Sequence, residues 1–571
     1  MSIDVVRAAA MLVEARAGTP GPGLPAGVDA ASVIGLLRRN KVPLMELEPG
    51  GPGRGAGWSE AVEEERRQRD ELADEFALVA GALRNDGIVP VLFKSAGGLP
   101  YRSSNIDLLV RPGQMAQAAS RLEQLGHLRF PHYREDHKLL FRRFRRGRSV
   151  ICVHLHEAVS WGRILILPGS DVVDRSRLPR SGESGFMVAS SEDLLLITLA
   201  HSLYETDQIR LSDLRALRLA AGDPGFDWSV AIERARRHGW TTGFFSILTI
   251  AADLEQVVFG ATRVPAGIRR QAGQALEGSM WARLYVARMK RACGPDLPDL
   301  PYPLSRTWSK VHAAALMMAA PDRSPDERLM DLVSTAENLL ATRMKLRCRP
   351  PVLVSLTGLD GSGKSSAIRV VGEAMTLCEI PTRIVWSRGG FTLPAQAAKR
   401  ATRAVMGDKV PGPAAMEEKR RWLSGGLTGS VYASLVVAEQ AVHYLLRVIL
   451  PRWGGSSIVC DRYVYDTWAD LEVKLSGSPR IAGWAGGLLL ALAPEPDLAL
   501  LLHLAPEEAA RRKPADASMG VLTRQAEFYE RMSALLGLRV IDAGRPDADV
   551  IDEVVDLALR KAFAKFAGEE S

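Results

Sequence analysis

Apolar positions follow two different periods along this chain of 571 residues. In the front half they recur mostly at helical spacing, and from 191 to 292 the pattern is mainly helical. A few short runs instead have the spacing of strands. These are IVPVLFK (88–94), IDLLVR (106–111), and the pair KLLFRRF and SVICVHLH (138–144 and 149–156), which predicts a hairpin. We therefore expect an α+β domain with helical additions over 58–292.

The pattern changes abruptly from Val352 onward. Short, nearly continuous apolar runs alternate there with long helical stretches, at 352–358, 383–388, 456–463, 497–504 and 538–543. Strands without a polar face are buried on both sides, so these runs predict a parallel sheet that is covered by helices on both faces. We expect a doubly wound α/β domain over 350–571.

The remaining segments have the composition of connections. Stretches rich in Gly and Pro at 18–27 and 48–57 bracket a short helical pattern, so residues 1–57 are interpreted as a loosely attached helical start. The segment GPDLPDLPYPL (294–304) interrupts regular structure, and 293–349 is interpreted as a Pro-rich linker followed by a helix.

Composition adds constraints on the class of protein. Hydrophobic residues make up 47% and charged residues 24%, which is typical of a globular protein with more than one core. The net charge of +7 allows anionic small ligands but is too dilute to indicate nucleic acid. The run RRFRRGR (142–148) has few interleaved aromatic residues and a turn glycine, so it is interpreted as an exposed hairpin tip.

The cysteines and the termini bear on the compartment. Five widely spaced cysteines form no C-x-x-C pair, which indicates neither a disulfide framework nor a cysteine zinc site: Cys152, Cys293, Cys348, Cys378 and Cys460. The N-terminus carries Asp4 early and lacks a signal pattern, and the apolar run at 481–493 is shorter than the roughly 20 residues that span a bilayer. We expect a cytoplasmic protein without a membrane segment; the oligomeric state stays open, a homodimer included.

The strongest chemical signal is a glycine-rich loop. Residues Gly358 to Ser365 (GLDGSGKS) fit the pattern G-x-x-x-x-G-K-[ST] between an apolar strand and a helical pattern that begins at Ser366. Glycines let backbone N–H groups converge on phosphate oxygens, and the helix adds the positive end of its dipole. The sequence therefore predicts an ATP site formed by Gly358, Asp360, Gly361, Ser362, Gly363, Lys364, Ser365 and Ser366.

Within this loop and after a later strand, four side chains are candidates for binding the metal and the phosphates. Lys364 is expected to reach the β- and γ-phosphates, and the Ser365 hydroxyl is expected to hold Mg²⁺. Asp461-Arg462-Tyr463 ends an apolar strand, where a carboxylate can reach the Mg²⁺ and an arginine can pair with a phosphate on an acceptor.

With these pieces in order, residues 350–565 resemble the thymidylate kinase family. The resemblance rests on TGLDGSGKSS, on the DRY at 461–463, on PDLALLLHLAPEEAARRK (496–513) and on LRVIDAGRPDADVIDEV (538–554). It implies a phosphotransferase that uses ATP and Mg²⁺ to phosphorylate a nucleoside monophosphate or a related small phosphorylated acceptor.

The resemblance also implies a role for individual residues. Asp360 would approach the acceptor sugar, Asp461 the metal and the acceptor phosphate, and Arg462 would clamp that phosphate, with Tyr463 beside it. Arg388 in WSRGG is similar in placement to the family's acceptor-binding arginine, although the usual R-E-P-G run is absent. Arg511 and Arg512, followed by Lys513 and Arg524, lie where the family has a mobile lid, and cations there would neutralise the transferring phosphoryl group. The expected L-D-V reads Leu502-His503-Leu504, and the base contacts after the DRY are not recognisable, so the acceptor base stays open.

The front domain carries a second resemblance. VLFKSAGGLPYRSSNIDLLVRPG (91–113) is similar to uncharacterised bacterial nucleotidyltransferase-like proteins, in which two carboxylates on one strand and a third on its neighbour hold metal ions. Here Asn105 occupies the first position, Asp107 keeps the second, and His154 stands where the third acid is expected. Lys94-Ser95 replaces the usual Lys-Gly. With one carboxylate left, we expect a degenerate transferase fold that serves in binding or scaffolding.

Alternatives remain for both domains. His154 and His156 alternate on a strand and with Asp107 have the chemistry of a transition-metal site, whereas the simpler interpretation is polar positions on a half-buried strand. The chain could also be an ATP-binding switch or scaffold without turnover, or an active nucleotidyltransferase in its front domain. A phosphotransferase requires Arg462 and a lid that face the loop, and nucleotidyl transfer requires further carboxylates beside Asp107.

Overall fold

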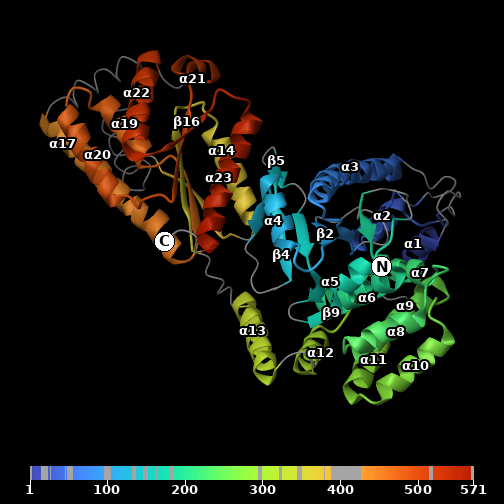
Figure 1. Cartoon of the computed structure of the whole chain (residues 1–571). Coiled ribbons are helices and arrows are strands. Elements are labelled where there is room, and N and C mark those ends of the chain that lie inside the picture. Colours follow the sequence, from blue (N-terminus) through green and yellow to red (C-terminus); the bar gives the residue numbers. More distant parts are fainter. Residues whose placement is uncertain are drawn as a thin grey trace. The chain divides into compact units, whose positions relative to one another are not determined.

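The chain forms two compact units in the computed structural model (Figure 1): Met1–Arg142 with Ile151–Leu346, and Arg143–Val150 with Arg347–Ser571. The structure describes residues 3–14, 24–25, 27–45, 47, 56–94, 105–130, 137–145, 148–149, 152–161, 164–179, 185–292, 299–319, 324–343, 350–378, 380–387, 426–513 and 518–567.

A six-stranded mixed sheet organises the first unit. In spatial order its strands are β10 (Met187–Val188), β1 (Val91–Leu92), β2 (Asn105–Leu109), β7 (Cys152–His156), β4 (Lys138–Arg142) and β3 (Leu128–Phe130). β2 and β7 are parallel, whereas β4 pairs with β7 antiparallel. The antiparallel pairing confirms the predicted hairpin. The short strands β5 (Phe144–Arg145) and β6 (Arg148–Ser149), which lie between β4 and β7 in the sequence and pair antiparallel, belong to the second unit.

Helices cover this sheet and then build a second core. α3 (Ala56–Asn85) and α4 (Met115–Gln124) bury one apolar face each against the strands. The hairpin of β8 (Ala158–Trp161) and β9 (Ile164–Pro168) and the short α5 (Gly169–Asp174) lead into the helical part. It consists of α6 (Ser191–His201), the π-helical turn η2 (Ser202–Thr206), α7 (Leu211–Ala221), α8 (Trp228–Arg237), α9 (Thr241–Phe259), α10 (Ala266–Glu277) and α11 (Met280–Ala292). The helical pattern over 191–292 is thus confirmed.

Two segments that were interpreted as attachments belong to the first core. α1 (Ile3–Glu14) and α2 (Ala30–Arg39) bury residues such as Leu12 and Leu36 in it, so the idea of a loosely attached start is wrong. β12 (Tyr302–Pro303) pairs with β11 (Gln208–Ile209), and Leu300 and Met317 are buried in the same core. α12 (Arg306–Ala319) is therefore part of the unit, and α13 (Pro325–Arg343) follows it.

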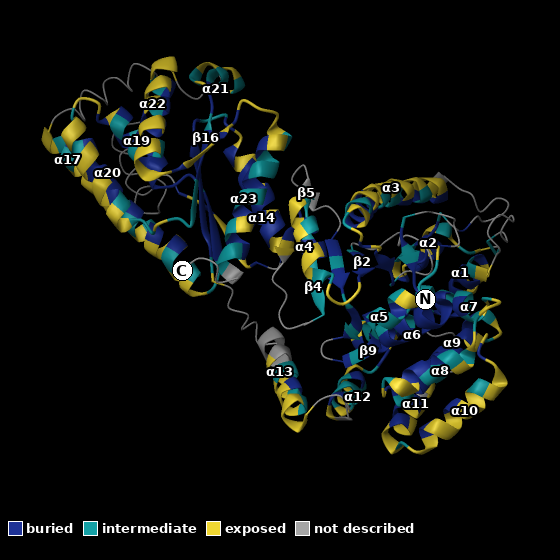
Figure 2. Ribbon diagram, viewed as in Figure 1, coloured by how far each residue is buried: buried dark blue, intermediate teal, exposed yellow. Residues whose placement is uncertain are grey.

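A five-stranded, fully parallel sheet forms the centre of the second unit, in the order β14 (Thr382–Trp386), β15 (Ser457–Asp461), β13 (Leu353–Gly358), β16 (Leu498–His503) and β17 (Arg539–Asp542). The central strand β13 is buried along its whole length. Figure 2 shows strands in the middle of this unit in dark blue, the colour of buried residues. Burial on both faces explains why the sequence of β13 is mostly apolar, with Ser355 and Thr357 as small polar residues that are also buried.

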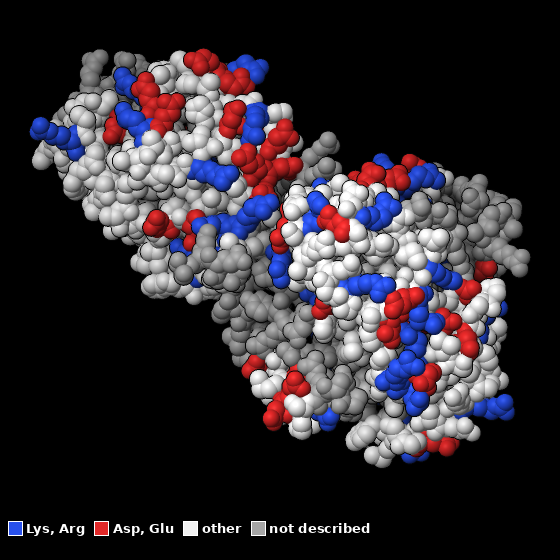
Figure 3. Space-filling model, viewed as in Figure 1, with Lys and Arg blue, Asp and Glu red and all other residues white. Residues whose placement is uncertain are grey.

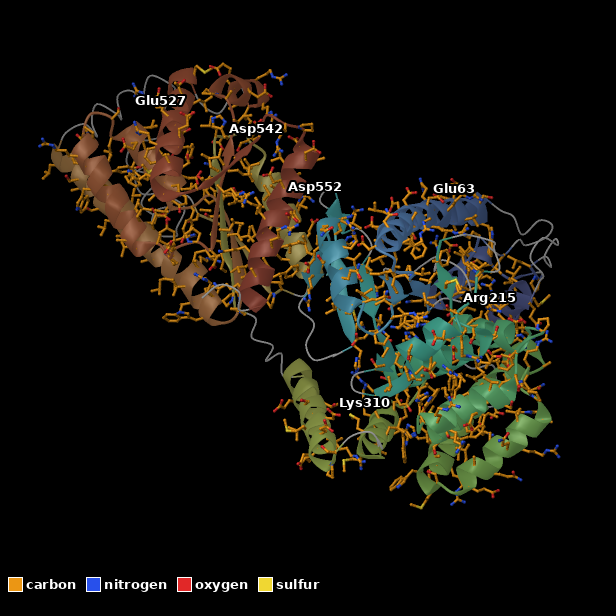
Figure 4. All side chains as sticks on the ribbon, in the orientation of Figure 1. Glu63, Arg215, Lys310, Glu527, Asp542 and Asp552 are labelled. Atoms are coloured by element: carbon orange, nitrogen blue, oxygen red, sulfur yellow. The ribbon has the colours of Figure 1, made fainter. Side chains whose placement is uncertain are left out.

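Helices cover both faces of this sheet, as expected from the alternating pattern. Figure 1 shows α14 (Lys364–Leu377) and α23 (Asp547–Ala567) on one face, and α17 (Gly426–Tyr444), α19 (Val464–Lys474), α20 (Pro479–Leu492) and α22 (Met519–Leu536) on the other. α17 continues through η3 (Leu445–Ile449) and α18 (Leu450–Trp453), and the short α21 (Pro506–Arg512) follows β16. Asp542, labelled in Figure 4, ends β17 at the carboxyl edge of the sheet, where parallel α/β sheets bind ligands.

By length and composition alone, two described helices could span a membrane. One is α9, whose apolar window is 67% buried, as in the core helix of a soluble protein; the other is the continuous helix 426–453, whose window is 33% buried. The sequence search had identified only the shorter run at 481–493. The expected absence of a membrane segment therefore stays a prediction.

Candidate active site

The glycine-rich loop connects β13 to α14 in the second unit, and three of its glycines have a positive φ. Gly358 has a φ of 143°, and a Cβ there would collide with the backbone oxygen of Leu502 on β16. Gly361 (φ 93°) lies against α21, where a Cβ would be 3.3 Å from the Ala509 oxygen. Gly363 (φ 84°) is the N-cap of α14. Side chains are excluded here by backbone conformation and by close neighbours, so the loop keeps the bare backbone that phosphate binding needs.

Lys364 extends back along this loop. Its Nζ donates hydrogen bonds to the carbonyl oxygens of Gly358 at 2.9 Å and Leu359 at 2.6 Å, and it lies 3.3 Å from Ser362 Oγ. The side chain is only 5% exposed. Burial, helped by the nearby charge of Arg462, lowers the pKa of Lys364 to about 8. The ammonium is thus held inside the loop, where phosphate oxygens would replace carbonyls as its acceptors.

The structure brings Ser365 and Asp461 together at the mouth of the loop. Ser365 Oγ donates to Asp461 Oδ2 at 2.9 Å. Ser365 is in the first turn of α14, next to the exposed Ser366, and Asp461 ends the neighbouring strand β15. A hydroxyl and a carboxylate are oxygen ligands of the kind that Mg²⁺ takes with water and phosphate oxygens. The residues present therefore fit a magnesium ion.

Arg462, which directly follows β15, faces the loop. It forms an ion pair with Asp360, and its other terminal nitrogen lies 3.2 Å from Asp466 Oδ1. Arg462 has a φ of 71°, a conformation that costs a residue other than glycine roughly 1–2 kcal/mol. This backbone conformation directs the guanidinium toward the loop rather than along the strand.

Asp466 was missed by the sequence analysis. Its carboxylate accepts hydrogen bonds from Thr357 Oγ1 at 2.5 Å, from the Tyr463 backbone N–H at 3.0 Å and from Tyr529 Oη at 3.0 Å, in addition to Arg462. It thereby ties β13, α19 and α22 together beneath the loop. An acidic residue at the third position of a helix is a recognised capping signal, and it was present in the sequence.

The two predicted lid arginines behave differently. Arg511 and Arg512 both donate to Glu508 at 2.8 Å. Arg512 also reaches the carbonyl oxygen of Gly361 at 3.5 Å and lies 3.7 Å from Asp547, whereas the Arg511 side chain is 78% exposed. The structure therefore brings Arg512, but not Arg511, to the loop.

The predicted acceptor residue Tyr463 is not brought to the loop. Tyr463 is fully buried beside Tyr444, with ring centroids 5.4 Å apart, and its hydroxyl donates to the Pro494 carbonyl at 2.6 Å. It acts as part of the core, so the predicted contact with an acceptor is not seen. Arg388 lies outside the described residues. His503 lies 3.4 Å from Glu530, as an ordinary polar residue at a strand end.

A second polar cluster is buried in the first unit, around Asp107. His154 Nδ1 is 3.2 Å and His156 Nε2 is 3.3 Å from Asp107 Oδ1, and Lys94 Nζ is 3.2 Å from the same oxygen. Burial alone would raise the pKa of Asp107, but Lys94 and both histidines hold it well below its usual range. Burial lowers the pKa of His154, and that of His156 to about 4, so both rings are neutral at pH 7. Asn105 begins β2, the strand that carries Asp107, and is half-buried.

Glu205, His201 and Trp161 complete this cluster and were also missed. Glu205 lies in η2, 3.4 Å from Lys94 Nζ and 3.3 Å from His201 Nε2, and it accepts from Trp161 Nε1 at 2.5 Å. Lys94 thus bridges two carboxylates, although only Asp107 was expected. The spacing His-x-x-x-Glu in a helical pattern was visible in the sequence, but its position beside β2 was not.

Comparison with known proteins finds two kinds of similarity. Residues 54–255 match the family model described as "Uncharacterised nucleotidyltransferase". The chain is also similar to two proteins named "Probable thymidylate kinase": that of Pyrobaculum calidifontis (25% identity over 216 residues, 37% of this chain and 96% of the relative) and that of Pyrococcus abyssi (25% over 220 residues, 36% and 94%). A "Thymidylate kinase" of Verminephrobacter eiseniae is 29% identical over 197 residues, 32% of this chain and 76% of the relative.

These similarities define the chain at a coarse level. It contains a nucleotidyltransferase-like domain over 54–255, and about a third of its length is similar to thymidylate kinases. Together they indicate a kinase or transferase within a mixed α/β protein.

Proposed function

We propose that the second unit is a phosphotransferase of the thymidylate kinase kind, which uses ATP and Mg²⁺ to phosphorylate a nucleoside monophosphate or a related small phosphorylated acceptor. The observation that carries this proposal is the ion pair of Arg462 with Asp360. A protein that only binds ATP needs the loop alone, whereas here a buried arginine from a strand end faces that loop. An acceptor phosphate is a ligand that such a guanidinium can bind in two-pronged fashion.

The residues would form two phosphate sites, one for the triphosphate and one for the phosphate of the acceptor. The loop amides and Lys364 would bind the triphosphate, and Ser365 and Asp461 would hold Mg²⁺, which neutralises charge on the β- and γ-phosphates. The phosphate of the acceptor would bind Arg462 in place of Asp360. The Asp360 carboxylate would then accept a hydrogen bond from the acceptor sugar. Arg512 would add positive charge beside Gly361. Catalysis of this kind is positioning and charge neutralisation, with no covalent enzyme intermediate.

A small acceptor also fits the surface charge. On the face drawn in Figure 3, acidic and basic side chains are interspersed on each unit. Nucleic-acid binding depends on cations gathered along one face. For the first unit we propose a degenerate transferase fold that serves in binding, since the Lys94 ammonium already bridges Asp107 and Glu205.

The test is ADP release by the purified full chain with Mg²⁺-ATP and a panel of nucleoside monophosphates and sugar phosphates. We expect one acceptor class to stimulate release, and Lys364→Ala to reduce that turnover by roughly a hundredfold or more. Arg369→Ala is the matched control, because Arg369 is exposed on the same helix and pairs with Glu373. ATP binding without stimulation by any acceptor would instead favour the switch or scaffold, and turnover unchanged in Lys364→Ala would refute the proposal.

A further inference from the structure

We propose that Asp107, His154 and His156 form a binding site for a divalent first-row transition metal ion of the zinc type in the first unit. This site is separate from the magnesium site of the second unit, and no step of the proposed phosphoryl transfer uses it. The proposal rests on the placement of three side chains on one face of two adjacent strands.

The sheet itself positions the three ligands. β2 and β7 are parallel neighbours, and Asp107 and His154 are register partners across them. His156 is two residues beyond His154 and so projects from the same face of the sheet. The carboxylate oxygen and one nitrogen from each ring all lie within 4.8 Å of one another. Strands hold such a group more rigidly than loops do, so little reorganisation is needed to bind an ion.

The two separations from the Asp107 oxygen match those of a tetrahedral ion. Zinc–nitrogen and zinc–oxygen bonds of about 2.0–2.2 Å at tetrahedral angles place neighbouring ligand atoms about 3.3–3.5 Å apart. Asp107 Oδ1 is 3.2 Å from His154 Nδ1 and 3.3 Å from His156 Nε2. These are long for N–H···O hydrogen bonds, which are most often about 2.9–3.0 Å. Small shifts of the side chains would therefore admit the ion.

The ligand types select the metal. Two imidazoles and one carboxylate suit zinc, cobalt, nickel or iron, whereas Mg²⁺ requires oxygen ligands. His156 is nine-tenths or more buried, and its Nδ1 has no hydrogen-bond partner among the residues that the structure describes. The ring is thus held through the nitrogen that faces Asp107. Three protein ligands would leave one tetrahedral position for water or a small anion.

Lys94 competes with the ion for the same carboxylate. Its Nζ lies 3.2 Å from Asp107 Oδ1, and a second positive charge at this distance would weaken metal binding. Glu205, 3.4 Å from the same ammonium, offers Lys94 another carboxylate when an ion takes Asp107. The lysine would therefore lower the affinity without closing the site, and its removal should tighten binding.

The test is Co²⁺ titration of the metal-stripped full chain in excess Mg²⁺, followed by the visible absorption of four-coordinate cobalt and by Zn²⁺ competition. We expect one Co²⁺ per chain, at least hundredfold weaker binding in His154→Ala and Asp107→Asn, and roughly tenfold tighter binding in Lys94→Met. His137→Ala is the matched control, because His137 also faces a carboxylate, Glu157 at 3.0 Å, on the same unit.

Folding and the kinase proposal are controlled separately. Circular dichroism and ADP release by the second unit should be unchanged in His154→Ala, whose side chain is partly exposed; if Asp107→Asn does not fold, His154→Ala alone decides. Absence of cobalt binding in the wild type, or equal binding in His154→Ala and His137→Ala, would overturn the metal site. Neither result would affect the assignment of the loop.

Discussion

The Ser365 hydroxyl donates a hydrogen bond to Asp461 over 2.9 Å, although 96 positions separate the two residues. The parallel pairing of β13 with β15, with Leu356 opposite Asp461, brings the end of one strand beside the loop that leaves the other. A hydrogen-bonded hydroxyl and carboxylate at the carboxyl edge of such a sheet are ready to share one cation.

If the two residues hold the same Mg²⁺ ion, their substitutions should act together. Ser365→Ala and Asp461→Asn should each raise the Mg²⁺ concentration for half-maximal turnover by roughly tenfold or more, because each removes an oxygen ligand. In the double variant this Mg²⁺ concentration should rise by less than the product of the two single increases. Turnover measured against Mg²⁺ at saturating ATP checks this, and fully independent effects would contradict a shared ion.

The pH dependence of ATP binding should report on Lys364. Burial, and then the charge of Arg462, lowers its pKa to about 8, and bound phosphates would raise that pKa again because they stabilise the ammonium. ATP affinity should therefore be constant below about pH 7.5 and fall as the pH rises through 8 and 9, by at most tenfold per pH unit. Calorimetry in buffers of different ionisation enthalpy would detect the accompanying proton uptake.

Lys364→Arg is the control for the decline of ATP affinity with rising pH. A guanidinium does not lose its proton in this range, so the variant should bind ATP more weakly but without the decline above pH 8. The same slope in both proteins would assign the pH dependence to another group.

The loop could be predicted from the sequence because its signal is local: glycines, a lysine and a serine lie within eight positions between a strand and a helix. The residues that contact the loop were harder to predict from the sequence. Asp461 and Arg462 follow a recognisable strand, but Asp466 gains its role only when Thr357 and Tyr529, both more than 60 positions away, donate to it. Hydrogen bonds of this range depend on helix packing, which periodicity does not encode.

The first unit shows the same limit more strongly. The strand that carries Asp107 was predicted, and so were the histidines on its neighbour, because alternation along a strand fixes which face they share. Glu205 and His201 join the same side-chain cluster from a helical segment about a hundred positions along the chain. The burial of α1 and α2 was likewise hidden, since Gly- and Pro-rich flanks suggested attachment rather than packing.

The backbone of Arg462 gives a stability prediction. Arg462→Ala and Arg462→Gly both remove the cation beside the buried Asp466, which should cost about 3 kcal/mol or more of unfolding free energy. At a φ of 71° glycine pays no steric cost, so the glycine variant should be the more stable of the two by about 1 kcal/mol. Urea denaturation, followed on the transition of the second unit, compares them. If Arg462→Ala were as stable as Arg462→Gly or more stable, the backbone strain at this position would have to be relieved elsewhere in the protein.

Two glycines one turn apart on α20 should respond oppositely to alanine. A Cβ on Gly483 meets no atom within 4 Å, whereas one on Gly486 would overlap the indole of Trp468 on α19. Gly483→Ala should therefore stabilise the second unit by about 0.5–1 kcal/mol through helix propensity, and Gly486→Ala should destabilise it by roughly 1–3 kcal/mol through overpacking. Because α19 carries Asp466 beneath Arg462, Gly486→Ala should also slow turnover while Gly483→Ala leaves it unchanged. Denaturation midpoints and ADP release measured on both variants test this prediction. If the two midpoints shifted in the same direction, α19 and α20 would not pack as closely as the overlap with Trp468 requires.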